Sequence, residues 1–232
     1  MVSAFEKAQQ NPGSTKTKIL NSALEKARQN PDSMKAKILN SARKLFGEYG
    51  FHGVTTRMMA KDVGIDISTL HYHWGDKKDL YEAVITDIND EIQLKLVEIE
   101  RKVRGKSMKF RLEVAIDVMA DYLFEYPEAS NLILFSYFGK TRPDSIMDTK
   151  LNEYMANIAI SMGLAPDKAG VSPQANARVL AVWNSIINFT SGENVFRPML
   201  NVDRDQYIEV VKDTLRFILI PAFTKESSIC PS

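Results

Sequence analysis

The sequence predicts an all-α protein, with a small N-terminal domain of three helices and a larger helical C-terminal domain. From residue 34 onward, apolar side chains recur at the three- and four-residue spacing that places them on one face of a helix. No segment shows the sustained alternation of apolar and polar residues that a half-buried strand needs. Glycine and proline gather between the helical blocks, where they would end helices.

The composition is that of an ordinary globular protein. Of the 232 residues, 44% are hydrophobic and 25% are charged, which separates the chain from disordered sequences. The single cysteine, Cys230, excludes a disulfide framework and favours the cytoplasm. The first residues, MVSAFEKAQQNPGS, lack the apolar core of a signal peptide, and no apolar run approaches the roughly 18 residues that span a bilayer. We therefore expect a cytoplasmic protein with no membrane partner.

The net charge of +1 conceals an uneven distribution. Residues 1–80 carry 13 Lys and Arg against 8 Asp and Glu, whereas residues 81–232 carry 17 against 21. A basic head on an acidic body is typical of a nucleic-acid-binding domain joined to a body of another function, although an excess of this size also arises by chance.

Residues 1–33 form an extension that contains a duplicated segment. Residues 3–23 realign with residues 22–42, and 16 of the 21 positions are identical. Two copies are too few for a solenoid, so the repeat indicates a local duplication of the lead-in to the first helix. We expect the first copy to form a short amphipathic helix that either docks or frays, and its lysines offer an arm for nucleic acid. The apolar stripe of this helix consists of Ile19, Leu20, Ala23, Leu24 and Ala27.

Well-marked breaks separate the helices expected after this extension. Gly50 lies in the first turn, Asp76 is placed to cap the long fourth helix, and Gly105 separates the fourth helix from the fifth. Further on, segments 163–173 and 192–201 are rich in residues that break helices. The expected helices are 34–48, 56–63, 67–73, 77–103, 107–125, 128–138, 145–162, 173–190 and 204–222.

Residues 55–74 carry the pattern of a helix-turn-helix. A short helix is followed by Gly64, which can adopt the positive φ of a tight turn, and by Asp66, which can cap a second short helix. The second helix presents polar side chains outward, as a recognition helix does. With the first helix, this pair predicts a three-helix DNA-binding domain over residues 34–80, followed by a helical ligand-binding and dimerisation domain over 81–232. The contacts between the two short helices are expected from Met59, Ala60, Val63, Ile65, Leu70 and Trp74.

The outward side chains of this segment have the chemistry that DNA recognition needs. Hydroxyls and ring N–H groups on the second helix can reach phosphates and base edges, and a guanidinium can form two hydrogen bonds with guanine O6 and N7. Ammonium groups at the start of the next helix can meet the phosphate backbone, or can be merely solvated. These candidate residues are Arg57, Thr69, His71, Tyr72, His73, Lys77 and Lys78.

The segment KILNSARKLFGEYGFHGVTTRMMAKDVGIDISTLHYHWGDKKDLYEAVI resembles the DNA-binding domain of the tetracycline-repressor (TetR) family of transcriptional regulators. The resemblance lies in A-x-x-L-F-x-x-x-G-F-x-x-x-T-T, then A-x-x-x-G-I-x-x-x-x-L-x-Y-H, an aromatic residue, and x-D-K-x-x-L. Trp74 stands where Phe is commonest in the family, and the lead-in is longer than usual. Beyond this segment the resemblance implies only a general plan, a helical body whose last two helices form a dimer.

The resemblance also implies roles for single residues. Thr56 would cap its helix and touch a phosphate, and Arg57 would face the bases. Tyr72, His73 and Lys77 would hold the DNA backbone, although Tyr72 also fits a packing aromatic. The further residues that would face the bases are Ile67, Ser68, Thr69 and His71.

Neither catalysis nor a cofactor is indicated. The three histidines lie between residues 52 and 73, and His71 and His73 lie about 200° apart around a helix, so they cannot share a metal ion. The sequence has no H-E-x-x-H motif, no paired-cysteine spacing and no phosphate-binding glycine loop. We expect a protein that is not an enzyme and that holds no metal or cofactor.

The acidic body is rich in large, soft side chains. Each of these side chains taken singly fits an ordinary helical core. Taken together, they also fit the lining of a ligand cavity between helices. Asn184 and Asn188 lie one turn apart beside Trp183, and buried amides need partners that a ligand can provide. We expect an apolar or amphipathic effector, and the candidate pocket residues are Tyr122, Phe135, Trp183, Asn184 and Asn188.

The last helix is apolar on more than one side toward its end. A surface helix of a monomer needs only one apolar stripe, so the second face predicts a partner. With 173–190 as its neighbour, we expect a four-helix interface across a two-fold axis between two copies of the chain. The candidate interface residues are Val211, Leu215 and Ile218.

The favoured hypothesis is a repressor that binds a palindromic operator in double-stranded DNA as a dimer and is released by a small molecule. An interaction protein of the same fold without DNA binding is the first alternative, and a corepressor-dependent regulator or an activator is the second. The intact polar residues of the recognition helix argue against the first alternative, and the sequence does not separate the others.

Overall fold

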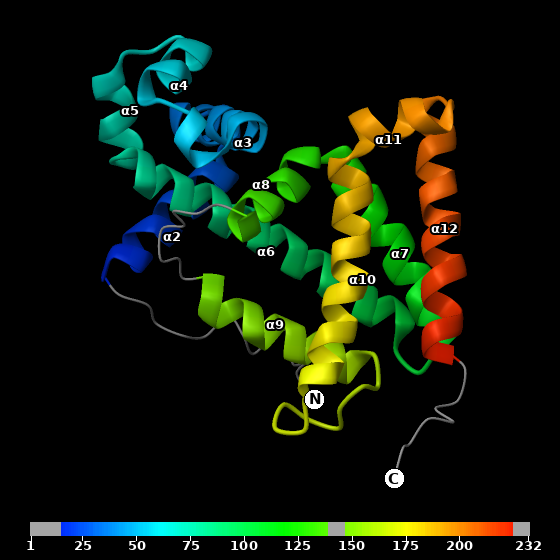
Figure 1. The fold of residues 1–232 in the computed structure, drawn as a ribbon. Coiled ribbons are helices and arrows are strands. Elements are labelled where there is room, and N and C mark those ends of the chain that lie inside the picture. The colour runs from blue at the N-terminus through cyan, green and yellow to red at the C-terminus, as the bar shows by residue number, and fades with distance from the viewer. Residues whose placement is uncertain (1–14, 139–146, 225–232) are drawn as a thin grey trace. The chain divides into compact units, whose positions relative to one another are not determined.

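The structure is a computed structural model, and it describes residues 15–138 and 147–224. Within these ranges the chain forms eleven α-helices and no strand, so the all-α prediction is confirmed. The first part of the duplicated segment, the start of the helix expected at 145–162, and Cys230 lie outside the described residues. The helices in Figure 1 are α2 (Thr15–Gln29), α3 (Met34–Gly53), α4 (Thr56–Val63), α5 (Ile67–Trp74), α6 (Lys77–Val103), α7 (Met108–Glu125), α8 (Pro127–Phe138), α9 (Met147–Ser161), α10 (Pro173–Ser191), α11 (Glu193–Leu200) and α12 (Arg204–Thr224).

The helices group into two compact units. The N-terminal unit contains α2 to α5, α6 up to Ile92, and α8. The C-terminal unit contains α6 from Gln93 onward, α7, and α9 to α12. The first half of α6 and the whole of α8 beyond Pro127 therefore group with the DNA-binding helices, whereas the sequence placed everything after residue 80 in the second domain.

The core of the N-terminal unit forms around α3. Ile38 and Phe46 are fully buried, and the ring of Phe46 meets that of Tyr81 edge-on at 5.1 Å between centroids. Gly50 adopts φ 67° and ψ 173°, which are not helical, so the first helical segment of α3 ends close to its expected end at residue 48 and a short second segment follows to Gly53. A side chain is disfavoured at that φ, so this kink requires glycine.

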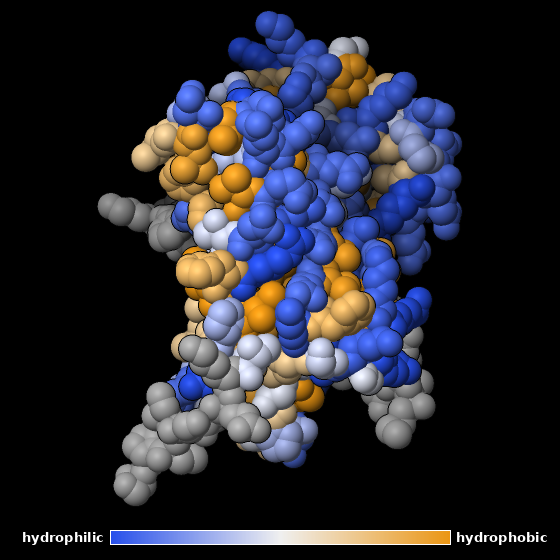
Figure 2. Space-filling model, turned by 90° about the vertical axis from the view of Figure 1, so that its right-hand side faces the viewer, coloured by the Kyte–Doolittle hydropathy of each residue, from blue (hydrophilic) through white to orange (hydrophobic). Residues whose placement is uncertain are grey.

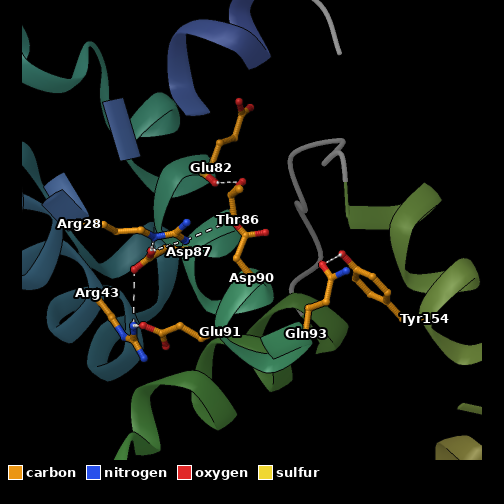
Figure 3. A network of polar contacts seen from close by, with 9 residues as sticks. All are labelled: Arg28, Arg43, Glu82, Thr86, Asp87, Asp90, Glu91, Gln93 and Tyr154. Atoms are coloured by element: carbon orange, nitrogen blue, oxygen red, sulfur yellow. Dashed lines mark hydrogen bonds and ion pairs between the residues drawn. The ribbon is translucent and has the colours of Figure 1, made fainter. Parts of the chain in front are cut away.

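The extension contributes α2, which docks along α3 as one of the two expected outcomes. Leu24 is 1% exposed and Leu20 and Ala27 are buried, whereas Ile19, at the outer edge of the expected stripe, is 67% exposed. Arg28 then reaches α6, where its guanidinium hydrogen-bonds the carboxylates of Asp87 and Asp90 (Figure 3). The duplicated helix is therefore held both by apolar burial and by ion pairs.

A second arginine continues this polar network inside the unit. Arg43 on α3 is 8% exposed and hydrogen-bonds Glu91 on α6 at 2.8 Å and Glu128 on α8 at 2.7 Å. Gly47 allows α8 to lie this close, because a Cβ at that position would be 2.4 Å from the Cβ of Glu128. Burial of a guanidinium is tolerated here because carboxylates from two other helices compensate its charge.

The C-terminal unit is built on α7, which packs against α10 and α12. Tyr207 on α12 is fully buried, and its hydroxyl donates a hydrogen bond to the carbonyl of Phe189 on α10. Burial, together with the charge of Glu193, raises the pKa of Tyr207 to about 12, so the phenol stays neutral. On the other side of the unit, the Tyr154 hydroxyl of α9 donates to Gln93 on α6 at 3.1 Å (Figure 3).

One helix was not expected. The segment 192–201 was predicted to be a break, but it contains α11. Gly192 lies at the N-cap and Asn201 adopts the left-handed conformation at the C-cap, so both lie at the ends of the helix. Pro198 lies inside, where it removes only one hydrogen bond of a two-turn helix.

Candidate DNA-binding site and effector cavity

The helix-turn-helix consists of α4 and α5, and side chains fix both of its junctions. The Thr55 hydroxyl accepts a hydrogen bond from the backbone N–H of Met58, so Thr55 caps α4, and the expected cap, Thr56, is instead the first helical residue. Gly64 ends α4 at φ 78° and ψ 35°, which is the left-handed turn that the sequence predicted. Asp66 caps α5 by accepting from the N–H of Thr69 at 2.6 Å.

The inner face of α5 locks the helix against α3. Leu70 is fully buried and Trp74 is 5% exposed, as expected for core residues. The Trp74 indole N–H donates to the carbonyl of Lys35 at 2.9 Å, and the Lys35 ammonium donates to the carbonyl of His73 at 2.6 Å. These reciprocal bonds set the rotation of α5, and with it the direction in which its outer face points.

The outer face of α5, and of α4 before it, is open to solvent. Tyr72 is 86% exposed, which argues against the alternative of a packing aromatic. Arg57, Ser68 and His71 are exposed as well, whereas Thr56, Ile67, Thr69 and His73 are partly covered. The predicted base-facing and backbone-facing residues of α4 and α5 thus all remain at least partly accessible to solvent.

Two polar groups on this surface already have partners in the protein, the Ser68 hydroxyl and Nδ1 of His71, which shares a 2.7 Å hydrogen bond with the carbonyl oxygen of Gly75. The Ser68 hydroxyl donates to Asp66 at 2.6 Å, and this bond, with those from Thr69, lowers the pKa of the Asp66 carboxyl. Desolvation and the nearby charge of Lys35 lower the pKa of His73. His73 is therefore neutral at neutral pH, and it can offer DNA a ring N–H donor without a full positive charge.

Lys77 differs from its expected role. Its ammonium donates to the carbonyl oxygens of Phe51 at 3.1 Å and Val54 at 3.0 Å, and it lies 4.3 Å from the ring centroid of Phe51. Two of its three donors are thus used inside the protein, so its structural role is to tie the start of α6 to the end of α3. Its neighbour Lys78 is exposed.

The C-terminal unit contains a cavity of about 100 Å³ between α6, α7, α9 and α10. A single water needs roughly 10–15 Å³ by this measure, so the cavity has room for an organic molecule of several atoms. Its walls are mainly aliphatic and thioether side chains, together with one indole ring. Ile99, Ile116, Met119, Ile158, Met162 and Trp183 belong to this lining.

The structure does not bring the five candidate pocket residues together. Trp183 lines the cavity, but Asn184 and Asn188 are exposed on another face of α10. Tyr122 is buried beside Tyr126, and the centroids of the two rings are 5.4 Å apart. Phe135 lies on α8 in the N-terminal unit. The amides that were expected to need a ligand are therefore solvated.

The candidate interface residues of α12 divide in the same way. Val211 and Leu215 are 1% and 0% exposed, so they belong to the core of their own chain and not to an outer face. Ile218 is 52% exposed, and its neighbour Phe217 is 80% exposed. Figure 2 views the side of the molecule that carries α12 in Figure 1 and shows apolar side chains among hydrophilic ones on it. α12 therefore has an exposed apolar face that includes Ile218 of the three expected residues but neither Val211 nor Leu215.

Three polar residues of the cavity lining were missed by the sequence analysis, and they are Glu100, Arg111 and Ser161. The Arg111 guanidinium donates to the Ser161 hydroxyl at 2.9 Å. Glu100 had a recognisable signal, because it falls on the same helical face as Leu96, Ile99 and Val103. Arg111 and Ser161 come from different helices, and the sequence contains no signal that pairs them.

No cluster of three or more His, Cys, Asp or Glu side chains among the described residues is arranged to hold a metal ion. No described helix combines the length and apolar character that a membrane span requires.

Comparison with known proteins supports the helix-turn-helix assignment. Residues 38–84 match the model of a family described as bacterial regulatory proteins, tetR family. The nucleoid occlusion factor SlmA of Marinomonas sp. (strain MWYL1) is 23% identical over 156 residues, which is 63% of this chain and 77% of that protein.

Solved structures resemble the whole described fold. A proposed fatty acid metabolism regulator of Clostridium perfringens has a TM-score of 0.63 at 17% identity, over 84% of this chain and 100% of that one. A TetR-like transcriptional regulator from Rhodococcus sp. RHA1 has a TM-score of 0.58 at 12% identity, over 82% and 95%. The regulator FadR of Bacillus subtilis, solved with stearoyl-CoA, has a TM-score of 0.53 at 14% identity, over 79% and 96%. Residues 38–84 thus carry the DNA-binding segment of the tetR family of bacterial regulatory proteins, and the described fold around them resembles those of solved transcriptional regulators.

Proposed function

We propose that this regulator is a repressor that binds a palindromic operator as a homodimer and leaves it when a small, largely apolar effector fills the cavity of the C-terminal unit. The observation that carries the proposal is the outer face of α5. Tyr72 is 86% exposed on a helix that Leu70 and Trp74 anchor from behind. A large aromatic held in solvent on a rigid short helix suits a partner that covers it.

The recognition chemistry follows from which side chains are accessible, with only Nε2 of His71 left for DNA because Nδ1 is bonded to Gly75. Arg57 projects from the first turn of α4 with an exposed side chain, and its guanidinium matches the two acceptors of guanine. Ile67, Thr69 and His71 lie on α5, the helix that would enter the major groove. Tyr72 and neutral His73 would donate hydrogen bonds to phosphates, and Lys78 would provide the charge that was expected from Lys77.

Dimerisation is supported by the outer faces of α10 and α12, which are neighbours in the C-terminal unit. Leu180 on α10 and Val210, Phe217 and Ile218 on α12 are 37% to 80% exposed. Large apolar side chains left in solvent on two adjacent helices favour pairing with the same surface of a second copy. A two-fold dimer would present two α5 helices to the two halves of a palindrome.

Release by an effector is supported by the cavity beside α6. This helix continues from the N-terminal unit into the C-terminal unit and contributes Leu96, Ile99 and Val103 to the cavity wall. A ligand that fits between α6 and its neighbours can therefore act on an element shared by both units. The structural relative FadR was solved with stearoyl-CoA, which is in keeping with a long apolar effector in a fold of this kind.

The decisive experiment is selection of binding sites from a random pool of double-stranded DNA with the full chain, repeated in the presence of a metabolite extract. We expect enrichment of a palindrome that the extract abolishes. Arg57→Ala should weaken binding by about 1–3 kcal/mol per half-site and relax preference at one base position, because it removes a two-bond contact with guanine. Lys106→Ala, which removes an exposed charge from the other unit, is the matched control and should bind normally. Absence of any enriched sequence would favour the interaction protein instead, and uniform weakening by Arg57→Ala would make Arg57 a phosphate contact.

A further inference from the structure

One residue of the cavity lining carries a buried polar atom whose hydrogen bonding is unfulfilled. Glu100 on α6 is among the lining residues, and its Oε2 is buried without a hydrogen-bond partner. Its other oxygen, Oε1, lies 3.8 Å from the guanidinium of Arg104, whose side chain is 67% exposed, so this contact is a weak surface ion pair. A carboxylate oxygen left bare in apolar surroundings is costly, and a donor placed beside it removes that cost.

The one cationic group of the described lining does not compensate Glu100. Arg111 on α7 uses its guanidinium to hydrogen-bond Ser161 on α9 at 2.9 Å, and the structure gives no ion pair between Arg111 and Glu100 within the described residues. The rest of the wall near Glu100 is aliphatic, with Leu96 one turn before it and Val103 nearly one turn after it. Among the described lining residues, Oε2 of Glu100 is thus the one buried side-chain oxygen or nitrogen that has no hydrogen-bond partner.

We propose that the effector is an apolar molecule with a hydrogen-bond-donating headgroup, a primary ammonium or a hydroxyl, that binds Oε2 of Glu100 while its hydrocarbon part fills the cavity. This inference rests on the proposed function, which places the effector in this cavity. The same reasoning disfavours a free carboxylate headgroup, which would bring a second negative charge to an acceptor that needs a donor.

The test compares three ligands that share a ten-carbon chain and differ only in the headgroup, which are decylamine, 1-decanol and decanoate, each below its micelle concentration. Binding is measured on the full chain by calorimetry, and also by the fluorescence of Trp183, which lines the cavity. The chain has two tryptophans, so Trp74→Phe isolates the signal of Trp183. Calorimetry on the unaltered protein gives the affinities independently, even if Trp74→Phe disturbs α5. We expect decylamine and 1-decanol to bind at least tenfold more tightly than decanoate.

Glu100→Gln provides the sharper comparison, because the amide keeps the size of the side chain, loses its charge and offers a donor of its own. This variant should bind decylamine at least tenfold more weakly and should gain affinity for decanoate. Glu98→Gln is the matched control, since Glu98 lies on the same helix but is 39% exposed and ion-paired with Lys95 and Lys102. It should leave all three affinities unchanged.

The possible results distinguish a wrong assignment to Glu100 from a wrong location of the effector site. Equal affinities for the three ligands, or a headgroup preference that Glu100→Gln leaves unchanged, would overturn the assignment to Glu100 while leaving the cavity as the effector site. Tighter binding of decanoate would overturn it in favour of Arg111. Failure of every ligand to bind would overturn both the inference and the effector site, and selection of a DNA sequence by the same protein would show that DNA binding survives.

Discussion

Arg28 on α2 donates two hydrogen bonds to one carboxylate oxygen of Asp87 on α6, from Nε at 2.9 Å and from Nη2 at 2.7 Å. Asp87 is 7% exposed, and burial raises the pKa of its carboxyl, while the hydrogen bond and charge of Arg28 lower it. The duplicated extension therefore provides a principal partner of a buried charge in the N-terminal unit. The extension, which the sequence left free to dock or to fray, therefore has a defined structural role.

Arg28→Met should destabilise the protein by roughly 1–2 kcal/mol at neutral pH, because ionised Asp87 would lose two charged hydrogen bonds while keeping Arg43 nearby. The folded-state pKa of Asp87 lies above its unfolded value, so the contribution of this group to stability is present at low pH and is lost as the pH rises through the folded-state pKa. The loss of unfolding free energy caused by Arg28→Met should therefore become smaller as the pH falls through that pKa. Urea denaturation of both proteins at neutral and acid pH measures this difference. Lys26→Met, an exposed change on the same helix, is the control, and a penalty that is the same at both pH values would contradict the ion pair.

Most helices were predictable from the sequence because each one buries a single apolar face. α4 and α6 have the expected bounds, and α10 differs by one residue. The exceptions have local causes. α3 has a second short segment after Gly50, whose φ of 67° and ψ of 173° are not helical. α11 was missed because Gly192 and Asn201 lie at its two ends and not inside it. The sequence pattern alone does not distinguish glycine and asparagine at the two ends of a short helix from a segment that has no helix.

The candidate site was predictable to the extent that it depends on local geometry. The turn at Gly64 and the cap at Asp66 need only neighbours in the sequence, and both are present. The role of Lys77 depends on the carbonyls of Phe51 and Val54, more than twenty residues away, so a lysine at the start of a helix looked free for DNA. The same limit applies to α12, where only tertiary packing decides that Val211 faces inward.

Substitution of Lys77 should lower the stability of the fold, whereas substitution of Lys78 should weaken DNA binding. Lys77→Met leaves the two carbonyls without their donor and should cost about 1–3 kcal/mol of stability, with little change in the salt dependence of binding. Lys78→Met should leave stability unchanged and reduce the log–log salt slope by roughly 0.9 per subunit, or about 2 for a dimer. Fluorescence anisotropy over a series of salt concentrations measures the slope. The opposite pattern, with a smaller slope for Lys77→Met alone, would return Lys77 to the DNA interface.

The imidazole of His73 should titrate below its ordinary pKa. Desolvation lowers this pKa first, and the charge of Lys35 adds to the effect, so Lys35→Met should raise it. Nuclear magnetic resonance of the ring protons against pH gives both values. Lys37→Met, which removes an exposed charge from the same helix, should leave the titration unchanged. An unaltered pKa in Lys35→Met would mean that burial alone sets the charge of His73.

The outer face of α12 should be the one that pairs two copies. Phe217→Glu combined with Ile218→Glu places two charges on side chains that are 80% and 52% exposed, so the variant should remain folded and sediment as a monomer. Val211→Glu would instead place a charge in the core and should give unfolded or insoluble protein. Met199→Glu, on exposed α11, is the control and should leave the dimer intact. A soluble dimer that carries both changes on α12 would place the interface elsewhere.

Removal of residues 1–32 tests what the duplicated extension contributes. A deletion of residues 1–21 alone would cut α2 in its middle, whereas this one retains Ser33, whose hydroxyl caps α3 by accepting from the N–H of Ala36 at 3.2 Å. Because Leu20 and Leu24 are buried against the unit, their loss should cost roughly 3 kcal/mol or more. For a chain of this size, that corresponds to a fall in Tm of roughly 6–12 °C.

The effect of this deletion on DNA binding should be small. The apolar side of α2 is occupied by packing and Arg28 is occupied by Asp87 and Asp90, so at a temperature where the shortened protein is folded we expect the same operator affinity and the same salt slope. Lys26 on α2 is exposed, and together with desolvation its charge lowers the pKa of Lys35, which hydrogen-bonds the carbonyl of His73 near the end of the recognition helix. Lys26→Ala tests the contribution of this one charge to DNA binding. If the deletion and Lys26→Ala both weaken DNA binding and reduce the salt slope, the extension is an arm that reaches the DNA backbone. Its docking on α3 would then orient the arm toward the DNA.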